Sequence, residues 1–288
     1  MPLYPFWKVT PGGNPTILLR GQDIPPAQRA SVAACIMSHQ HIGGEQVGYV
    51  RFEGVPRLDM MGGEFCLNAT RAFAAVLASR GLLHRCGSVL SGAVEVSGAD
   101  SPVRVRVTER EGDLPLAEAC LHFDTLPQPE TCGNGLSLVR VPGIAHVIHQ
   151  EGAAPLPTED RLSAFCADER NALSLDKEEA VGHLWLRHAD DGTDTCTNCG
   201  KALLLVLDPV VWVRDTATLC FESACGSGTL ACALAEHAAS GTTDFAIVQP
   251  SGSALSVRME KAGQGWDVWV GGPARLTACG ETELTGLL

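Results

Sequence analysis

Short apolar runs alternate with Gly and Pro turns over most of the chain, a pattern typical of β-strands. These runs predict two strand pairs and two further buried strands interrupted by a turn at Asp208 and Pro209. The pairs are residues 93–96 with 103–107 and 245–248 with 255–259, and the interrupted strands are 203–207 and 210–213. A fold rich in strands follows from this pattern.

Two segments differ from the rest, because they are Ala-rich, apolar over most of their faces and free of Pro. They cover residues 68–80 and 228–239. Such a composition predicts helices that are buried on nearly all sides. Each predicted helix follows a cysteine, Cys66 in the first case and Cys225 in the second.

The two helical segments match each other at equal offsets, and a second block matches downstream. Cys, Thr and two Ala positions coincide in the helices, and a Ser-Gly turn followed by Val-Arg recurs in both halves, at residues 97–104 and 251–258. Matches between Ala-rich helices alone could arise by chance, but the second block favours a diverged internal duplication. We therefore expect two similar halves, with the two helix-start cysteines facing each other across a cleft between them.

Composition and charge narrow the class of protein. The chain has 288 residues, of which 45% are hydrophobic and 19% charged, as in a globular protein. A formal net charge of −12 without any basic run argues against nucleic acid and anionic membranes as partners. Neither a membrane-spanning stretch nor a signal peptide is predicted, so we expect a cytoplasmic protein.

Twelve cysteines are a high number for such a chain. In a reducing compartment most of them are expected to be buried and inert. Cys196 and Cys199 form a single C-x-x-C motif, but a structural zinc site needs four ligands and no second such pair follows. His183 and His188 lie near in sequence without a familiar spacing, so we expect loop thiols and no metal ligands.

The two helix-start cysteines lie in segments with candidate chemistry, residues 62–70 and 222–229. Small or capping residues there lead into the first turn of a helix, where unpaired N–H groups and the positive dipole end favour anions. That environment is expected to lower the pKa of a thiol and to bind a carboxylate. One such motif alone would fit a simple helix cap, whereas two matching motifs favour catalysis.

These two motifs, together with residues 11–14 and 44–48, resemble the pyridoxal-independent racemase and epimerase superfamily that includes diaminopimelate epimerase. Residues 61–70 and 222–229 are most similar to the histidine racemases that supply D-histidine for opine-type metallophores. The resemblance implies an α/β (α+β) fold of two pseudo-symmetric domains, each a curved, mostly antiparallel sheet wrapped around a central helix. It places the domains at residues 1–128 plus 274–288 and at 129–273.

The resemblance also implies that Cys66 and Cys225 are the acid and base of a racemisation that needs no cofactor, with an amino acid as the small-molecule substrate. Leu67 stands where the superfamily usually has Gly after the first cysteine, and residues 216–218 lack its Glu-Arg-Gly segment, which argues against diaminopimelate. Histidine is the favoured substrate, with ornithine, lysine or diaminopimelate as alternatives. A non-catalytic, thiol-rich metal-binding or redox protein is the rival from another class, and a homodimer is possible.

Further candidates for substrate binding surround the two cysteines. Asn14 and Asn68 could bind the substrate, but roles in turns and caps explain them equally well. Glu45 lies in a Gly-rich segment, 43–48, that could act as a lid and hold an imidazole or amine, or it could be a solvated loop charge. His146 is either near the substrate or a satisfied, half-buried histidine. The complete predicted set is Asn14, Glu45, Leu67, Asn68, His146, Glu222, Gly226, Ser227 and Gly228.

Overall fold

The computed structural model describes residues 3–22, 24–150, 152–189, 195–197 and 200–284. Contacts within the chain divide it into two compact units. Unit 1 comprises Met1–Leu121 with Gly271–Leu288, and unit 2 comprises His122–Val270. The domain limits given above, 1–128 plus 274–288 and 129–273, stay a prediction.

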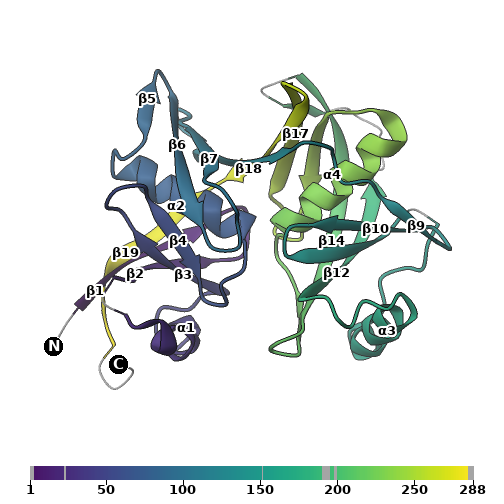
Figure 1. Cartoon of the computed structure of the whole chain (residues 1–288), viewed down its shortest axis with the longest axis horizontal. Helices are drawn as coiled ribbons and strands as arrows, with labels where there is room; N and C mark the ends of the chain where they lie inside the picture. The colour runs from purple at the N-terminus through teal and green to yellow at the C-terminus, as the bar shows by residue number, and fades with distance from the viewer. Residues whose placement is uncertain (1–2, 23, 151, 190–194, 198–199, 285–288) are drawn as a thin grey trace. The chain divides into compact units, whose positions relative to one another are not determined.

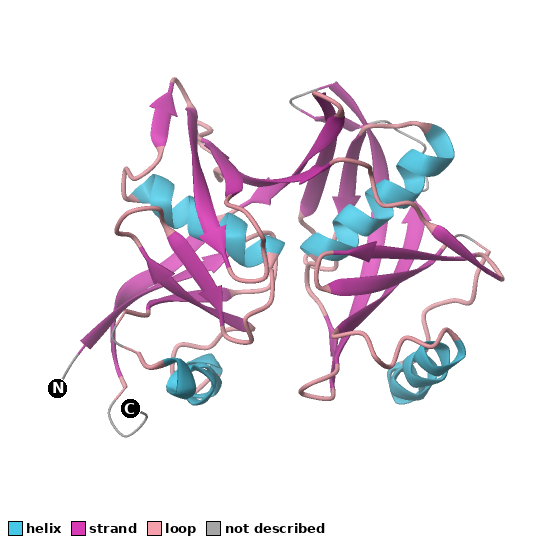
Figure 2. Ribbon diagram, in the orientation of Figure 1, coloured by secondary structure: helices cyan, strands magenta, loops and turns pink. Residues whose placement is uncertain are grey.

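Unit 1 contains one long buried helix, α2 (Leu67–Ser79), among strands (Figures 1 and 2). The helix packs against β1, β2, β3, β4, β6, β7 and β19. The other elements are β1 (Leu3–Thr10), β2 (Thr16–Arg20), η1 (Pro26–Gln28), α1 (Arg29–Met37), β3 (Gln46–Arg51), β4 (Arg57–Met60), β5 (His84–Cys86), β6 (Val89–Val96), β7 (Val103–Thr108), β8 (Leu116–Phe123) and β19 (Arg275–Glu283).

Unit 2 has the same plan around its own helix, α4 (Gly226–Ser240), which packs against β10, β11, β12 and β17. The other elements are β9 (Glu130–Gly133), β10 (Leu136–Val141), β11 (Ile144–His149), α3 (Glu159–Ala172), β12 (Ala180–His188), β13 (Thr195–Thr197), β14 (Gly200–Val213), β15 (Thr218–Phe221), β16 (Asp244–Val248), β17 (Ala254–Ala262) and β18 (Gly265–Pro273).

Strand pairing is the clearest sign of the duplication. In unit 1 the order β1, β2, β3, β4, β6, β7 is joined by antiparallel, parallel, antiparallel, parallel and antiparallel pairs. In unit 2 the order β10, β11, β12, β14, β16, β17 is joined by the same succession of pairs. Two pseudo-symmetric, mostly antiparallel units around central helices are therefore confirmed as the fold.

The predicted elements are largely confirmed. Both helices start within two residues of their predicted positions, because each begins at its cysteine and contains no Pro. The strand pairs also form, as β6 with β7 and β16 with β17.

The predicted break at Asp208 and Pro209 is wrong, because β14 runs without interruption from Gly200 to Val213. One edge of β14 pairs with β16 through residues 203–206 and with β15 through residues 210–213. Pro209 lies between these two stretches, and its carbonyl accepts a hydrogen bond from the Glu222 N–H at 3.0 Å. The N–H that Pro209 lacks is therefore not needed for the pairing of β14 with β16 or with β15.

An outer helix covers the second face of the sheet in each unit. In unit 1, Val32 and Ile36 of α1 pack on Ile17, Val47 and Tyr49. In unit 2, α3 contributes Cys166 to a cluster with Trp185 of β12 and Val210 of β14. Each sheet thus lies between its central helix and an outer helix, and both faces are buried.

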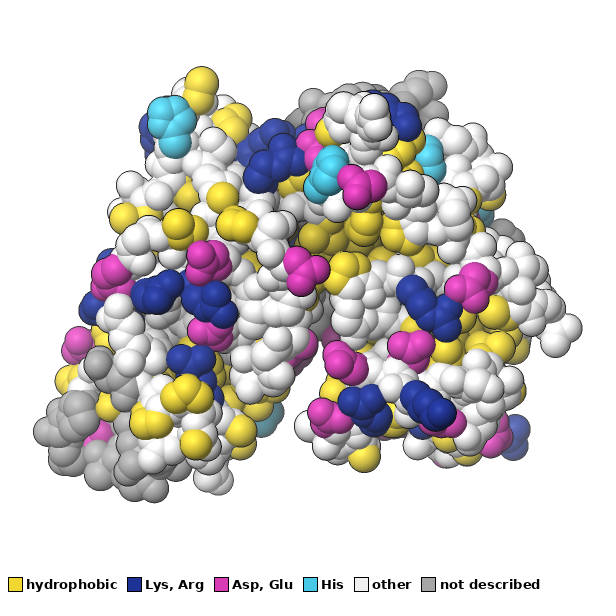
Figure 3. All heavy atoms as spheres, in the orientation of Figure 1, with side chains coloured by type: hydrophobic (Ala, Val, Ile, Leu, Met, Phe, Trp, Pro, Cys, Tyr) yellow, Lys and Arg dark blue, Asp and Glu magenta, His cyan; other side chains and the backbone are white. Residues whose placement is uncertain are grey.

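The surface carries charges of both signs. On the face drawn in Figure 3, Lys and Arg side chains lie interspersed with Asp and Glu side chains. The exposed ion pairs of the protein include Arg85 with Glu109 at 2.5 Å and Arg140 with Glu130 at 2.5 Å. No helix among the described residues is both long and apolar enough to cross a bilayer.

Candidate active site

Cys66 caps the amino terminus of α2 in unit 1. Its backbone is extended, with φ −133° and ψ 112°, and its sulfur accepts a hydrogen bond from the Ala69 N–H at 3.4 Å. The Thr70 hydroxyl donates to the Cys66 carbonyl at 2.7 Å and so fixes the first turn from the other side. The sulfur therefore lies at the positive end of the helix, as the sequence predicts.

A chain of hydrogen bonds links Cys66 to the turn that contains Asn14. The thiol donates to Gln46 Oε1 at 3.2 Å, and Gln46 Nε2 donates to the Thr16 hydroxyl at 2.7 Å. The Thr16 hydroxyl donates in turn to the Asn14 carbonyl at 3.1 Å. Asn14 is buried and has a positive φ of 48°, a conformation that Asn tolerates better than most residues.

Arg71 holds together the segments around Cys66, which form the half-site of unit 1. Its side chain is fully buried and donates to the carbonyls of Ala117 at 2.9 Å and Pro11 at 3.2 Å. It also donates to the Asn68 side-chain oxygen at 3.3 Å. Burial lowers the pKa of Arg71 to about 10, and the charges of Glu118 and Cys66 limit this decrease. Arg71 therefore stays a cation at neutral pH and fixes the position of Asn68.

Cys225 caps α4 in unit 2 with nearly the same backbone, at φ −122° and ψ 106°. Its sulfur accepts from the Gly228 N–H at 3.3 Å and lies 3.5 Å from the Ser227 hydroxyl. The Thr229 hydroxyl donates to the Cys225 carbonyl at 2.6 Å. The two cysteines thus have equivalent local geometry, one in each unit.

Gln249 holds the second half-site in place, and sequence reasoning missed it. Its side-chain oxygen accepts from the Cys225 N–H at 3.0 Å, and its amide donates to the Thr229 hydroxyl at 3.1 Å and to the Ile247 carbonyl at 3.0 Å. The residue is 2% exposed, so these bonds have no competition from water. Gln46 and Arg71 were missed in the same way.

The expected low pKa is wrong for Cys225. Burial raises the pKa of this thiol well above its usual value, and the neighbouring Glu222 carboxylate raises it further. Hydrogen bonds from Ser227 and the Gly228 N–H act in the opposite direction and do not compensate. Desolvation of the thiolate therefore outweighs the helix end, and Cys225 holds its proton in this state.

His146 is fully buried in unit 2, and neither of its ring nitrogens has a hydrogen-bond partner among the described residues. Burial lowers its pKa to about 3, so the ring is neutral. It lies over Gly182 of the neighbouring strand, where an added Cβ would come within 2.1 Å of His146 Nδ1. The expectation of a half-buried histidine with hydrogen-bond partners is wrong, because the ring is fully buried. It fits at this depth because residue 182 is a glycine and has no side chain.

The other predicted residues take varied positions. Leu67 and Gly226 open the two helices and are buried, Ser227 and Glu222 are half-buried near Cys225, and Glu45 is exposed. The predicted lid at 43–48 is only partly a loop, because β3 begins at Gln46. Cys199 lies outside the described residues, as does the side chain of Cys196.

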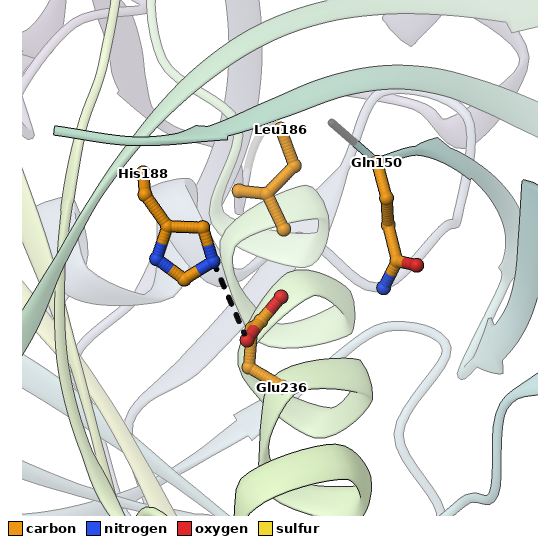
Figure 4. Close-up of a pocket in the computed structure, with 4 residues that line it drawn as sticks. All are labelled: Gln150, Leu186, His188 and Glu236. Carbon is orange, nitrogen blue, oxygen red and sulfur yellow. Dashed lines mark ion pairs between the residues drawn. The ribbon is translucent and has the colours of Figure 1, made fainter. Parts of the chain in front are cut away.

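A cavity of about 200 Å³ in unit 2 lies apart from Cys225. It is lined by Gln150, Leu186, His188 and Glu236, and His188 Nε2 lies 4.0 Å from Glu236 Oε2 (Figure 4). Glu236 lies about three turns along α4 from Cys225, which is roughly 16 Å at the usual rise per residue. This cavity is therefore not part of the thiol site.

Comparison with known proteins agrees with the geometry of the two half-sites. A family model described as the histidine racemase CntK N-terminal domain matches residues 4–182. The chain belongs to the histidine racemase family. A histidine racemase of Fusobacterium nucleatum subsp. nucleatum is 27% identical over 97% of each chain. By family, the chain is thus an isomerase of the racemase and epimerase type.

Solved structures show the same fold at low sequence identity. A hydroxyproline epimerase from Agrobacterium vitis matches with a TM-score of 0.64 and 10% identity over 97% of this chain and 92% of that one. A phenazine biosynthesis protein of the PhzF family from Enterococcus faecalis matches with a TM-score of 0.60 and 17% identity over 98% and 100%. The duplicated architecture is thus shared by proteins of different activities.

Proposed function

We propose that this protein racemises histidine without a cofactor, using Cys66 and Cys225 as acid and base on opposite faces of one α-carbon. The observation that carries the proposal is the pair of equivalent cysteines, each capping the central helix of one unit and each accepting a backbone N–H. Membership of the histidine racemase family supports the substrate.

Racemisation needs this arrangement because an α-proton is only weakly acidic. Without a cofactor to delocalise the carbanion, positioned N–H donors in a dry site must stabilise the charge. A helix dipole contributes about 0.3–1 kcal/mol, whereas enzymes lower barriers by roughly 8–23 kcal/mol. The first-turn N–H groups at Gly226 and Ser227 are therefore proposed to bind the substrate carboxylate directly.

The surroundings of the two thiols support different starting roles. Cys225 is fully buried beside Glu222 and holds its proton, which suits the general acid. A Cys66 thiolate would be attracted to the buried Arg71 cation, since the charge of Cys66 raises the pKa of Arg71. We assign Cys66 as the base and Cys225 as the acid in the free enzyme, and the roles exchange in the reverse reaction.

The remaining predicted residues are assigned to binding rather than to proton transfer. Arg71 holds the Asn68 side chain, and the Thr16 hydroxyl donates to the Asn14 backbone carbonyl. Both asparagines are proposed to bind the amino acid head. Glu45, exposed at the start of β3, is proposed to bind the imidazole. A larger, more basic substrate such as ornithine or lysine is the alternative that this carboxylate would also suit.

The test is chiral chromatography of L-histidine, D-histidine, ornithine, lysine and diaminopimelate after incubation with enzyme and reductant, with no pyridoxal phosphate added. Histidine is expected to racemise fastest. Cys66→Ser and Cys225→Ser should each lose several orders of magnitude in kcat, because a serine hydroxyl is far too weak a base at neutral pH.

Matched controls come from cysteines outside the two helix caps. Cys86 is exposed in unit 1 and Cys132 is half-buried in unit 2, and serine at either position should leave kcat within about twofold. Turnover of a different amino acid would replace the proposed substrate, and activity that survives serine at both caps would remove the proposed mechanism.

A further inference from the structure

A second cluster of polar side chains lies on the opposite face of the unit 2 sheet, away from Cys225. Gly182 and Leu184 of β12 face α4, since a Cβ at Gly228 would come within 3.0 Å of Leu184. His183, between them, points to the other face, where α3 packs. There His183 of β12 meets His149 of β11 and Glu169 of α3.

The three side chains converge on one point. Glu169 Oε2 lies 2.6 Å from His183 Nδ1 and 3.1 Å from His149 Nε2. One ligand atom from each residue lies within 4.8 Å of those of the other two. In a tetrahedral zinc site with bonds near 2.0–2.1 Å, neighbouring ligand atoms are about 3.3 Å apart, so small side-chain shifts suffice to accommodate an ion.

Every polar contact of the two rings is directed at that point. Within the part of the chain that the structure describes, His149 Nδ1 and His183 Nε2 are buried without a hydrogen-bond partner, so the shared carboxylate oxygen is the polar contact of each ring. The His149 ring also stacks on Trp185 at 4.5 Å between centroids, with Phe165 at 5.8 Å. Aromatic packing thus fixes the His149 ring in an orientation that presents Nε2 to the shared carboxylate.

The cluster is also buried. The side chains of His149 and His183 are at most 1% exposed and that of Glu169 is 8% exposed. A cation at this point would meet a carboxylate oxygen and two imidazole nitrogens, which are partners of the kind that a buried charge requires.

We propose that His149, Glu169 and His183 bind one divalent transition-metal ion, with Zn²⁺ as the best fit and a fourth position left for water. Two imidazoles and one carboxylate select Zn²⁺ and its neighbours over Mg²⁺ and Ca²⁺, which prefer oxygen ligands. On binding, each ring proton moves to the far nitrogen of its own ring, so Nε2 of His149 and Nδ1 of His183 become ligands and no proton is lost.

The ion would join α3 to the middle of the sheet. α3 supplies Glu169, while β11 and β12 supply the histidines, so all three ligands come from separate elements of unit 2. The sequence alone predicts no metal site, and in it His183 and His188 lie near the C-x-x-C motif without a familiar ligand spacing. The structure selects His183 from that group and supplies two partners that lie 34 and 14 residues upstream of it.

The experiment is titration of the metal-free protein with Co²⁺ as a spectroscopic stand-in for Zn²⁺, followed by Zn²⁺ competition. Because the chain has twelve cysteines, the assay must separate nitrogen and oxygen ligation from thiolate ligation. Tetrahedral Co²⁺ absorbs in the visible region with either ligand set, but only thiolates add a near-ultraviolet charge-transfer band. The wild type and the Cys196→Ser/Cys199→Ser variant are therefore compared directly.

Glu169→Gln and His183→Gln keep the size of each side chain and remove one ligand. His188→Gln is the matched control, because this histidine is 51% exposed on the same strand as His183. Loss of a direct ligand should weaken binding by more than the roughly 10–100-fold that follows loss of an outer-shell partner. Far-ultraviolet circular dichroism identifies any variant that fails to fold, and His149→Gln then takes its place.

The proposal expects one Co²⁺ per chain in wild type, in His188→Gln and in the C-x-x-C variant, without a thiolate band. It also expects Zn²⁺ to raise the Tm of these three proteins but not of the ligand variants. Metal binding that persists in Glu169→Gln and His183→Gln overturns the proposal, as does a thiolate band for the bound Co²⁺. Absence of stoichiometric binding in wild type overturns it equally.

Discussion

Gln249 is the residue whose removal should reveal most about how the second cysteine is held. Gln249→Met keeps nearly the same length and volume but removes three hydrogen bonds, to the Cys225 N–H, the Thr229 hydroxyl and the Ile247 carbonyl. All three lie in the interior, since Gln249 is 2% exposed.

The expected cost follows from the groups left behind. The Cys225 N–H and the Ile247 carbonyl lose a buried partner, and each such loss costs about 1–3 kcal/mol. The Thr229 hydroxyl retains the Cys225 carbonyl as its acceptor at 2.6 Å, so its loss is smaller. Burial of the more apolar Met side chain offsets part of the cost, and we expect a net loss of about 2–4 kcal/mol.

Urea denaturation, monitored by tryptophan fluorescence, measures this change in the free energy of unfolding of unit 2. Four of the five tryptophans, Trp185, Trp212, Trp266 and Trp269, lie between residues 122 and 270. Gln264→Met, in the exposed turn between β17 and β18, is the control and should change stability by less than about 0.5 kcal/mol.

Activity of the same variant reports the position of the thiol. If Gln249 fixes the Cys225 backbone, kcat should fall by about tenfold or more at temperatures where the protein is fully folded. A Gln249→Met protein as stable as the Gln264→Met control would refute the reasoning about the buried N–H and carbonyl. Unchanged kcat would refute the positioning role.

Three further predictions concern the same two half-sites. Burial lowers the pKa of His146 to about 3, below its unfolded value near 6.5, so the unfolded chain takes up a proton first and the free energy of unfolding decreases as pH falls from 6.5 towards 3. Between pH 7 and pH 5, His146→Leu should therefore lose less unfolding free energy than wild type in denaturation experiments. A Cβ at Gly228 would lie 3.1 Å from Cys225 Sγ, so Gly228→Ala should lower kcat. The free energy of unfolding should change by less than about 1 kcal/mol, because the better helix propensity of Ala offsets the crowding, and an unchanged kcat would contradict the role of this contact. Air oxidation should inactivate the enzyme through a disulfide between Cys66 and Cys225 and reductant should restore activity, whereas full activity in protein shown to contain that disulfide contradicts the mechanism.

The local features of the fold were predictable from the sequence. The two central helices follow from Pro-free, Ala-rich segments, and their start points follow from cysteines that cap them. The duplication was visible in matching residues, although the order of strand pairs was not, because parallel pairs such as β2 with β3 join strands whose starts are 30 residues apart.

Residues that act through tertiary contacts left no signal in the sequence. Arg71 bonds to carbonyls near residues 11, 117 and 273, so its role depends on the folded arrangement of distant segments. Gln249 follows a strand end and resembles any polar turn residue until α4 is packed beside it. The raised pKa of Cys225 was missed for the same reason, since desolvation depends on what surrounds the helix end.

The central claim is that Cys66 and Cys225 act as separate acid and base, and hydrogen exchange with solvent tests it most directly. L-histidine is incubated with enzyme in deuterated water, and both enantiomers are separated and analysed by mass spectrometry at no more than about ten per cent conversion. One thiol removes the original hydrogen and the other, already exchanged, delivers deuterium to the opposite face. The account predicts that early D-histidine is fully deuterated while the remaining L-histidine stays protiated. Early D-histidine that carries substantial protium would contradict it.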